Sequence, residues 1–213
     1  MSPTQSLAPH GLAALRRLAA QRAPDERCDF CSLALGEEHD HLVEPGTPQV
    51  ICACYACALL FTSTGETKYR RVPRLIRRLE GFQLTDEQWN GLGIPISMVF
   101  FFKSSTNNKI SALYPSPAGP TESQLDLDAW EEIVRNNPVL RTISPDVEAL
   151  LVSRVENTRD YYLAPIDQCY KLTGLIRRHW RGFSGGEDAW NQIRLFFSEL
   201  RQRSTPTSIG HHA

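Results

Sequence analysis

Five of the six cysteines in this chain of 213 residues lie between positions 28 and 57. Two pairs have the C-x-x-C spacing, Cys28 with Cys31 and Cys54 with Cys57. Thiolates separated by two residues can both reach one tetrahedral metal ion from a tight turn, and two such turns supply four ligands. The spacing therefore predicts a metal site formed by Cys28, Cys31, Cys54 and Cys57.

Three more residues of this stretch are alternative ligands. Cys52 lies just before the second pair, and His39 and His41 lie between the two pairs. Imidazole is a competent zinc ligand, so either histidine could replace a cysteine. The structural alternatives are a solvated His-x-His turn and a buried strand cysteine, which behaves as a small hydrophobic residue.

Zinc is the predicted ion, and iron is the alternative. Four thiolates suit both ions, but rubredoxin-like iron sites usually have glycine after the second cysteine of each pair, where φ is often positive. Ser32 and Ala58 occupy those positions, which favours zinc. A catalytic zinc keeps one of its four positions open, so four cysteines predict a structural or redox-active ion.

Disulfides are the competing interpretation of the cysteines. A chain of this length can bury a core without disulfides, and its first residues lack the apolar segment of a secretory signal. In a reducing compartment, paired C-x-x-C motifs are more often metal sites than bridges. We therefore expect a cytoplasmic protein that binds a metal.

The charge and hydropathy of the chain bear on its partners. The net charge of −1 gives no overall field that attracts nucleic acid. The longest apolar run, residues 94–102, is too short to span a bilayer, so no membrane insertion is expected. One dense basic run contains Arg70, Arg71 and Arg74. It is interpreted either as a solvated face or as a partner-binding surface for an acidic protein or a nucleic-acid backbone.

Motifs and periodicity divide the chain into four segments. We expect an N-terminal tail and amphipathic helix at 1–24, a Cys-rich metal-binding module at 25–66, an α+β domain at 67–203 and a disordered tail at 204–213. The predicted fold class is α+β. In it, a small zinc-ribbon-like or treble-clef-like module sits on a mixed domain with a β-hairpin and C-terminal helices.

Within the module, short strands at 41–44 and 49–51 flank a Pro-Gly turn. A helix is expected from about residue 56, with the second cysteine pair near its start. Four apolar residues among the cysteines are expected to pack the module on the main domain: Phe30, Tyr55, Leu59 and Leu60.

In the main domain, a capping box at 85–88 predicts a short helix, and the apolar segment 98–102 pairs with 109–114 in a β-hairpin. The basic run is expected to enter a short helix, and the proline-rich segment 115–123 is expected to be a rigid loop. Periodicity and N-terminal signals predict four further helices, at 128–136, 144–155, 166–180 and 184–200. Ser144 and Pro145 signal the start of the second of these helices, and a capping box from Ser184 to Glu187 signals the start of the fourth.

Motifs of hydrolases, nucleotide-binding loops and zinc proteases are absent from the sequence. Cys169 lies on the apolar stripe of the predicted helix 166–180 and is expected to be a core residue. His179 follows ten residues later on the same helix, about 15 Å away, and is too far to act as its base. We therefore expect that the protein is not an enzyme.

Several blocks of the sequence form a specific combination. They are Cys28-x-x-Cys31, Cys52-Ala-Cys54-Tyr-Ala-Cys57-Ala-Leu-Leu-Phe61, Tyr114-Pro-Ser-Pro-Ala-Gly-Pro-Thr-Glu-Ser123, Pro138-Val-Leu140, Asp146-Val-Glu-Ala-Leu-Leu151 and His179-Trp-Arg-Gly-Phe-Ser-Gly-Gly186. Together they resemble an uncharacterised bacterial, actinobacterial family whose members are encoded beside the genes of nickel–iron uptake hydrogenases. The resemblance covers roughly residues 25–203 and implies an accessory role in hydrogenase assembly or electron transfer. It implies no catalytic residues.

Three functions are compatible with these observations. The first is a non-catalytic, metal-binding accessory protein that binds a hydrogenase subunit or maturation factor. The second is a rubredoxin-like iron electron carrier that serves a hydrogenase. The third is a zinc-dependent nucleic-acid-binding regulator, which the near-neutral net charge disfavours.

Overall fold

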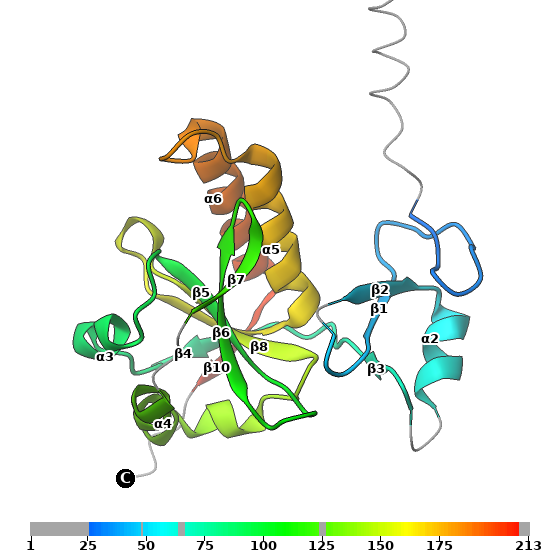
Figure 1. Cartoon of the computed structure of the whole chain (residues 1–213), viewed down its shortest axis with the longest axis horizontal. Helices are drawn as coiled ribbons and strands as arrows, with labels where there is room; N and C mark the ends of the chain where they lie inside the picture. The colour runs from blue at the N-terminus through cyan, green and yellow to red at the C-terminus, as the bar shows by residue number, and fades with distance from the viewer. Residues whose placement is uncertain (1–25, 48, 64–66, 124–126, 209–213) are drawn as a thin grey trace, which may run out of the picture.

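The protein is described by a computed structural model, which covers residues 26–47, 49–63, 67–123 and 127–208. It is a mixed α+β structure with one seven-stranded and one three-stranded sheet (Figure 1). The predicted α+β class is therefore confirmed. The N-terminal tail and amphipathic helix expected at 1–24 lie wholly outside the described residues, as do residues 209–213 of the expected C-terminal tail.

The larger sheet is antiparallel except at one edge, where its first two strands run parallel. Its strands in spatial order are β10 (Thr205–Ser208), β4 (Arg77–Glu80), β9 (Asp160–Pro165), β8 (Glu148–Ser153), β5 (Met98–Lys103), β6 (Ile110–Ser116) and β7 (Gly119–Ser123).

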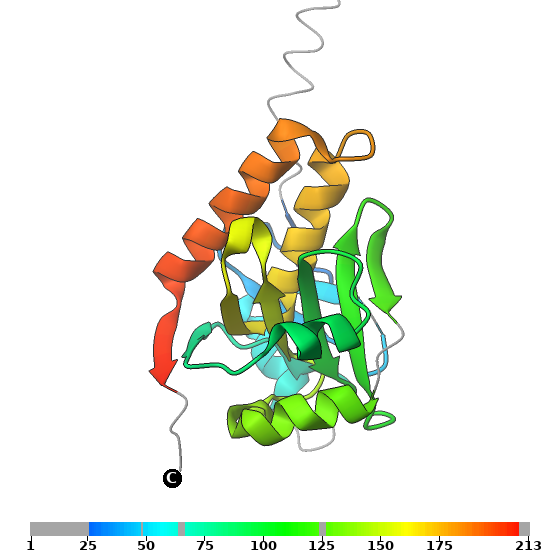
Figure 2. The same cartoon turned by 90° about the vertical axis from the view of Figure 1, so that its left-hand side faces the viewer.

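Both faces of this sheet are covered (Figure 2), which explains why the middle residues of its central strands are apolar on both sides. Alternate residues of a strand point to opposite faces. Met98 and Phe100 of β5 therefore pack in one cluster with α5 (Ile166–His179) and α6 (Gly186–Arg203). Val99 and Phe101 pack in the other, beneath α4 (Leu127–Asn136) and η1 (Pro138–Thr142).

Several predicted elements of the main domain are confirmed. The hairpin is β5–β6, the helix at 128–136 is α4, and the helix at 166–180 is α5. Thr85 caps α3 (Asp86–Gly91) with the expected reciprocal hydrogen bonds to Gln88. Cys169 is fully buried in α5, as a core residue should be.

The helix expected at 144–155 is wrong, because this segment forms a turn and then β8. Asp146 has φ 67°, a left-handed conformation that no helix tolerates in its first turn. Its backbone N–H donates to the Lys103 carbonyl, and its carboxylate accepts from the Ser105 N–H. These long-range bonds replace the helix start that Ser144 and Pro145 suggested.

Four other expectations are wrong. Residues 115–123 are not a loop, because they end β6 and form β7 around Gly119, whose φ is 119°. The basic run enters strands and not a helix, namely β3 (Arg70–Arg71) and β4. The last helix starts at Gly186 without the side-chain cap expected from Ser184, and Thr205–Ser208 of the expected tail form β10 beside β4.

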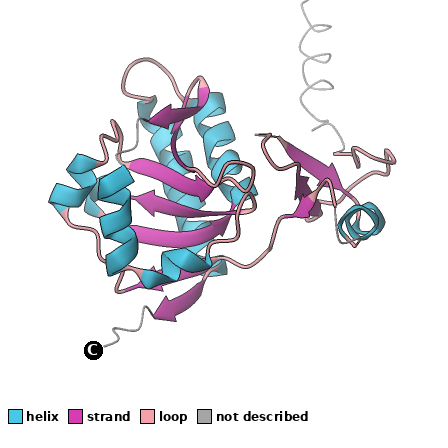
Figure 3. Cartoon of the chain, turned by 60° about the horizontal axis from the view of Figure 1, so that its bottom comes forward, coloured by secondary structure: helices cyan, strands magenta, loops and turns pink. Residues whose placement is uncertain are grey.

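The Cys-rich module is a three-stranded antiparallel sheet with one helix, and it lies beside the larger sheet (Figure 3). The strands β1 (Asp40–Val43) and β2 (Val50–Ala53) form the expected hairpin, and α2 (Tyr55–Thr62) follows directly. Because β3 pairs with β1, the module extends beyond the expected boundary at residue 66.

The module contacts the main domain through its hairpin and through the residue that follows β3. Val43 and Val72 belong to the same buried cluster as α5 and α6. Tyr55, Leu59 and Leu60 are exposed, so the expectation that they pack on the main domain is wrong. Phe30, the fourth residue of that group, stacks on Phe61 inside the module.

Candidate metal centre

The four cysteines of the two C-x-x-C pairs come together at one end of the module. The sulfur atoms of Cys28, Cys31, Cys54 and Cys57 all lie within 4.8 Å of one another. The sulfurs of Cys31 and Cys54, from different pairs, are 3.8 Å apart. Cys28 and Cys54 are buried, and Cys31 is at the surface. Four such sulfurs could hold one metal ion.

Each pair is positioned by local backbone structure. The first pair lies in a tight turn, where Ser32 has φ 61° and donates its N–H to the Cys28 carbonyl at 2.8 Å. Ser32 thus adopts the conformation for which glycine is usually chosen. In the second pair, Cys54 is the N-cap of α2, and its sulfur accepts the N–H of Cys57 at 3.5 Å.

The sulfurs differ in their affinity for a proton. Burial raises the pKa of Cys28, but backbone N–H groups, that of Cys54 first, favour its thiolate and hold the pKa at about 6. Burial and the neighbouring sulfurs raise the pKa of Cys57 to about 12. The Leu33 backbone favours the Cys31 thiolate, but the Cys28 sulfur and burial outweigh it and raise the pKa of Cys31.

These pKa shifts follow from backbone N–H groups at Cys28 and from burial and the neighbouring sulfurs at Cys57. One thiolate forms readily, and its charge makes ionisation of the next sulfur costly. A bound metal ion reverses this effect, because it stabilises every thiolate that coordinates it. The arrangement therefore suits a cation. The donor set alone does not distinguish zinc from iron.

The alternative ligands do not join this group. His39, His41 and Cys52 form a second group, in which one potential ligand atom of each lies within 4.8 Å of those of the other two. His41 also pairs with Asp167 of α5 at 2.7 Å. The sequence analysis did not single out Asp167 as a site residue. Its only signal was its place in the first turn of a predicted helix, which does not reveal a partner 126 positions away.

The three arginines of the basic run are engaged in ion pairs within the chain. Arg71 and Arg74 contact Asp40 at 2.8 and 3.1 Å, and Arg70 approaches Asp146 at 3.5 Å. Burial raises the pKa of Asp40, but the two guanidinium groups outweigh burial and hold that pKa below its usual value. These pairs give the basic run a structural role. Its role as a partner-binding surface stays a prediction.

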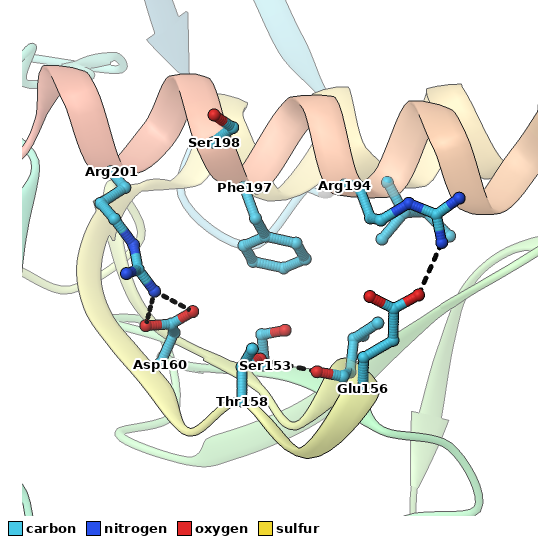
Figure 4. Close-up of a pocket in the computed structure, with 10 residues that line it drawn as sticks. Ser153, Glu156, Thr158, Asp160, Arg194, Phe197, Ser198 and Arg201 are labelled. Atoms are coloured by element: carbon cyan, nitrogen blue, oxygen red, sulfur yellow. Dashed lines mark hydrogen bonds and ion pairs between the residues drawn. The ribbon is translucent and has the colours of Figure 1, made fainter.

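Figure 4 shows a separate cavity of about 290 Å³ between α6 and the connection from β8 to β9. Its charged side chains pair across the opening, Arg201 with Asp160 at 2.6 Å and Arg194 with Glu156 at 2.6 Å. Because these groups already satisfy one another, the cavity supports no assignment of a ligand.

Residues 27–204 match a family described as a family of unknown function, DUF5947. The chain belongs to this family. The match spans both the Cys-rich module and the main domain, so this DUF5947 chain carries its four cysteines within the family's own boundaries.

Comparisons with curated proteins and with solved structures gave no match. Family membership confirms the resemblance to an uncharacterised family and adds no function to it. Among the described residues of this DUF5947 protein, no helix is both long enough and apolar enough to cross a membrane.

Proposed function

We propose that this protein is a non-catalytic accessory protein in which four cysteines bind one zinc ion. The ion fixes helix α2, and the exposed face of α2 binds a protein partner. The partner is a subunit or a maturation factor of a nickel–iron hydrogenase. The cluster of four sulfurs within 4.8 Å carries the proposal.

The order of elements around the cysteines supports a treble-clef-like zinc module. A tight turn supplies Cys28 and Cys31, the β1–β2 hairpin follows, and the first turn of α2 supplies Cys54 and Cys57. Four protein thiolates fill a tetrahedral zinc site and leave no open position, which is typical of structural zinc. Such a site stabilises a fold and does not activate a substrate.

The surface of α2 supports the binding role. Tyr55 and Leu59 are four residues apart and therefore share a face of the helix, with Leu60 beside them. These side chains are 65%, 40% and 67% exposed. Exposed apolar groups that gather on one short element mark sites of protein interaction more often than scattered ones do. The hydrogenase partner is proposed from the resemblance of the sequence blocks described above.

The experiment is affinity purification of the tagged full-length chain from its native host, followed by identification of the bound proteins. The wild-type chain should retain hydrogenase subunits or maturation factors. Leu60→Ser should lose them, because it removes apolar area from the α2 face. Leu195→Ser is the matched control, since Leu195 is 55% exposed on α6 of the main domain.

Two results would contradict the proposal. If the wild-type chain purifies without any hydrogenase protein, the proposed partner is wrong. If the wild-type and Leu60→Ser chains retain the partner equally, α2 is not the surface that binds it.

A second candidate is an electron carrier with iron on the same four thiolates. The left-handed conformation of Ser32 favours it, because the first knuckle has the backbone geometry for which rubredoxin-like sites usually use glycine. Colour separates the two candidates, since a ferric tetrathiolate absorbs visible light and zinc does not. A colourless protein after aerobic purification eliminates iron.

A further inference from the structure

A second group of metal-binding side chains lies on the hairpin of the module. His41 of β1 and Cys52 of β2 are directly opposite each other in the strand register, so their side chains share one face. His39 lies just before β1, two positions from His41. The two imidazole rings are 4.6 Å apart between centroids. One ligand atom of each of the three residues lies within 4.8 Å of the others.

Both histidines are oriented through Nδ1. The His39 Nδ1 is 3.0 Å from the Gly36 carbonyl oxygen, which can only accept, so Nδ1 carries the proton. The His41 Nδ1 is 2.7 Å from a carboxylate oxygen of Asp167. In the neutral imidazole, each Nε2 then carries a lone pair. A histidine held by a carbonyl or carboxylate at one nitrogen is the usual arrangement around a metal bound at the other.

The Nε2 atom of His39 is a buried polar atom that a metal ion could satisfy. The His39 side chain is 6% exposed, and its Nε2 is buried with no hydrogen-bond partner among the described residues. A buried polar atom without a partner destabilises a fold, and such atoms are rare. A metal ion between this nitrogen, His41 and Cys52 would satisfy it.

We propose that His39, His41 and Cys52 form a second metal site, separate from the four-cysteine centre, which binds a divalent transition metal ion such as Zn²⁺ or Co²⁺. Two imidazoles and one thiolate suit these ions, whereas Mg²⁺ and Ca²⁺ prefer oxygen ligands. Asp167 is a positioning residue that orients His41. The site does not depend on the proposed function of the four cysteines.

The second site differs from the first in its coordination number. Three protein ligands leave one position of a tetrahedral ion for water or a small anion. His39 and His41 line a cavity of about 640 Å³, together with Glu37, Arg74 and Tyr170. An ion bound there would be reachable from solvent. It would also connect the hairpin to α5 through Asp167, at the contact between module and main domain.

The test is metal stoichiometry on the metal-free full-length chain, titrated with Co²⁺ and followed by absorption, with total Zn²⁺ measured in parallel after reconstitution. Wild type should bind two ions per chain. Cys52→Ser and His41→Gln should each bind one. Asp167→Asn should bind two, with the dissociation constant of the weaker ion raised about 10- to 100-fold.

His179→Gln is the matched control. His179 also pairs through Nδ1 with a carboxylate, that of Asp188 at 2.6 Å, but it belongs to no metal-binding group among the described residues. It should bind two ions with wild-type affinities. Azide should change the Co²⁺ spectrum of wild type loaded with two equivalents and leave that of Cys52→Ser unchanged, because only the second site has an open position.

A wild-type chain that binds one ion overturns the proposal, and so do Cys52→Ser and His41→Gln chains that still bind two. If these variants lose both ions, the substitutions have disturbed the fold. Alkylation of the wild-type chain then tests whether Cys52 binds the second ion. The rate at which iodoacetamide modifies Cys52 should fall between one and two equivalents of Zn²⁺. An unchanged rate overturns the site.

Discussion

The Cys-rich module and the main domain reach a folded state by different means. Among the described residues, two hydrophobic clusters of nineteen and fourteen residues lie on the two faces of the main domain's sheet, and the module contributes Val43 to the larger one. The module's own cluster contains three buried residues among those the structure describes, Leu42, Ala53 and Ala58. Hydrophobic stabilisation is roughly proportional to the apolar area removed from water. The main domain can therefore fold on its core, whereas the module needs another source of stability.

The four cysteines supply that source in the module. In the proposed function, an ion shared by the four sulfurs fastens the turn at Cys28 and Cys31 to the first turn of α2, beside the stack of Phe30 on Phe61. The ion can then hold α2 with Tyr55, Leu59 and Leu60 facing solvent.

The largest expected effect follows from metal removal. Structural zinc contributes about 10–16 kcal/mol of apparent binding free energy in zinc-finger peptides, and this energy is also folding energy. After chelation, we expect proteolytic cleavage within residues 26–63, mapped by mass spectrometry. All four tryptophans lie in the main domain, so tryptophan fluorescence should still show its denaturation. If chelation unfolds the module and the main domain together, the two regions do not fold independently.

The next largest effect is expected from a core substitution in the main domain, which should lower its stability and leave the metal in the module. Phe100 is fully buried at the centre of the sheet, and Phe100→Ala should lower the free energy of unfolding by about 3–5 kcal/mol. Tryptophan fluorescence in urea measures this change. Bound metal per chain should equal that of wild type. A loss of metal together with the loss of stability would mean that the module depends on the core of the main domain.

A smaller effect is expected at Asp40, which links β1 to the basic run. Its carboxylate is 3% exposed and accepts hydrogen bonds from Arg71 and Arg74. Asp40→Asn removes the charge and should lower the free energy of unfolding of the module by about 1–3 kcal/mol. The measurement is the rate of proteolytic cleavage within residues 26–63 in the absence of chelator. Glu122→Gln is the control, because its pair with Lys109 is exposed and worth at most about 1 kcal/mol. Equal costs in the two variants would argue against a structural role of the basic run.

The smallest effect is expected on the exposed face of α2. Leu60→Ser should change the stability of the module by no more than about 0.5 kcal/mol, because Leu60 is 67% exposed. The same proteolysis assay measures it. A clearly larger loss would show that Leu60 supports the fold, and it would weaken the proposal that this face is kept for a partner.

The sequence predicted best what local pattern determines. The C-x-x-C pairs, the Thr85 capping box and the stripe of Cys169 in α5 depend on neighbours within a few positions, and all three lie as their spacing indicates. The hairpin of β5 and β6 was recognisable because Val99–Phe102 is apolar at every position, as a strand covered on both faces must be.

What the sequence could not show depends on partners far along the chain. Residues 144–155 have the start signals and apolar spacing of a helix. Within this segment, however, β8 forms because it pairs with β5 on one side and β9 on the other. Arg70, Arg71 and Arg74 resembled a free basic surface because Asp40 and Asp146 lie about 30 and 75 positions away. The pairing of His41 with Asp167 was hidden for the same reason.

The most direct test of the four-cysteine centre is X-ray absorption spectroscopy on the Cys52→Ser chain as purified, in which the second proposed site lacks its thiolate. The absorption edge identifies the ion, and the fine structure counts its ligands. We expect a zinc edge and four sulfur ligands at about 2.3 Å. Nitrogen or oxygen in place of any of the four sulfurs, or a chain purified without metal, would contradict the account.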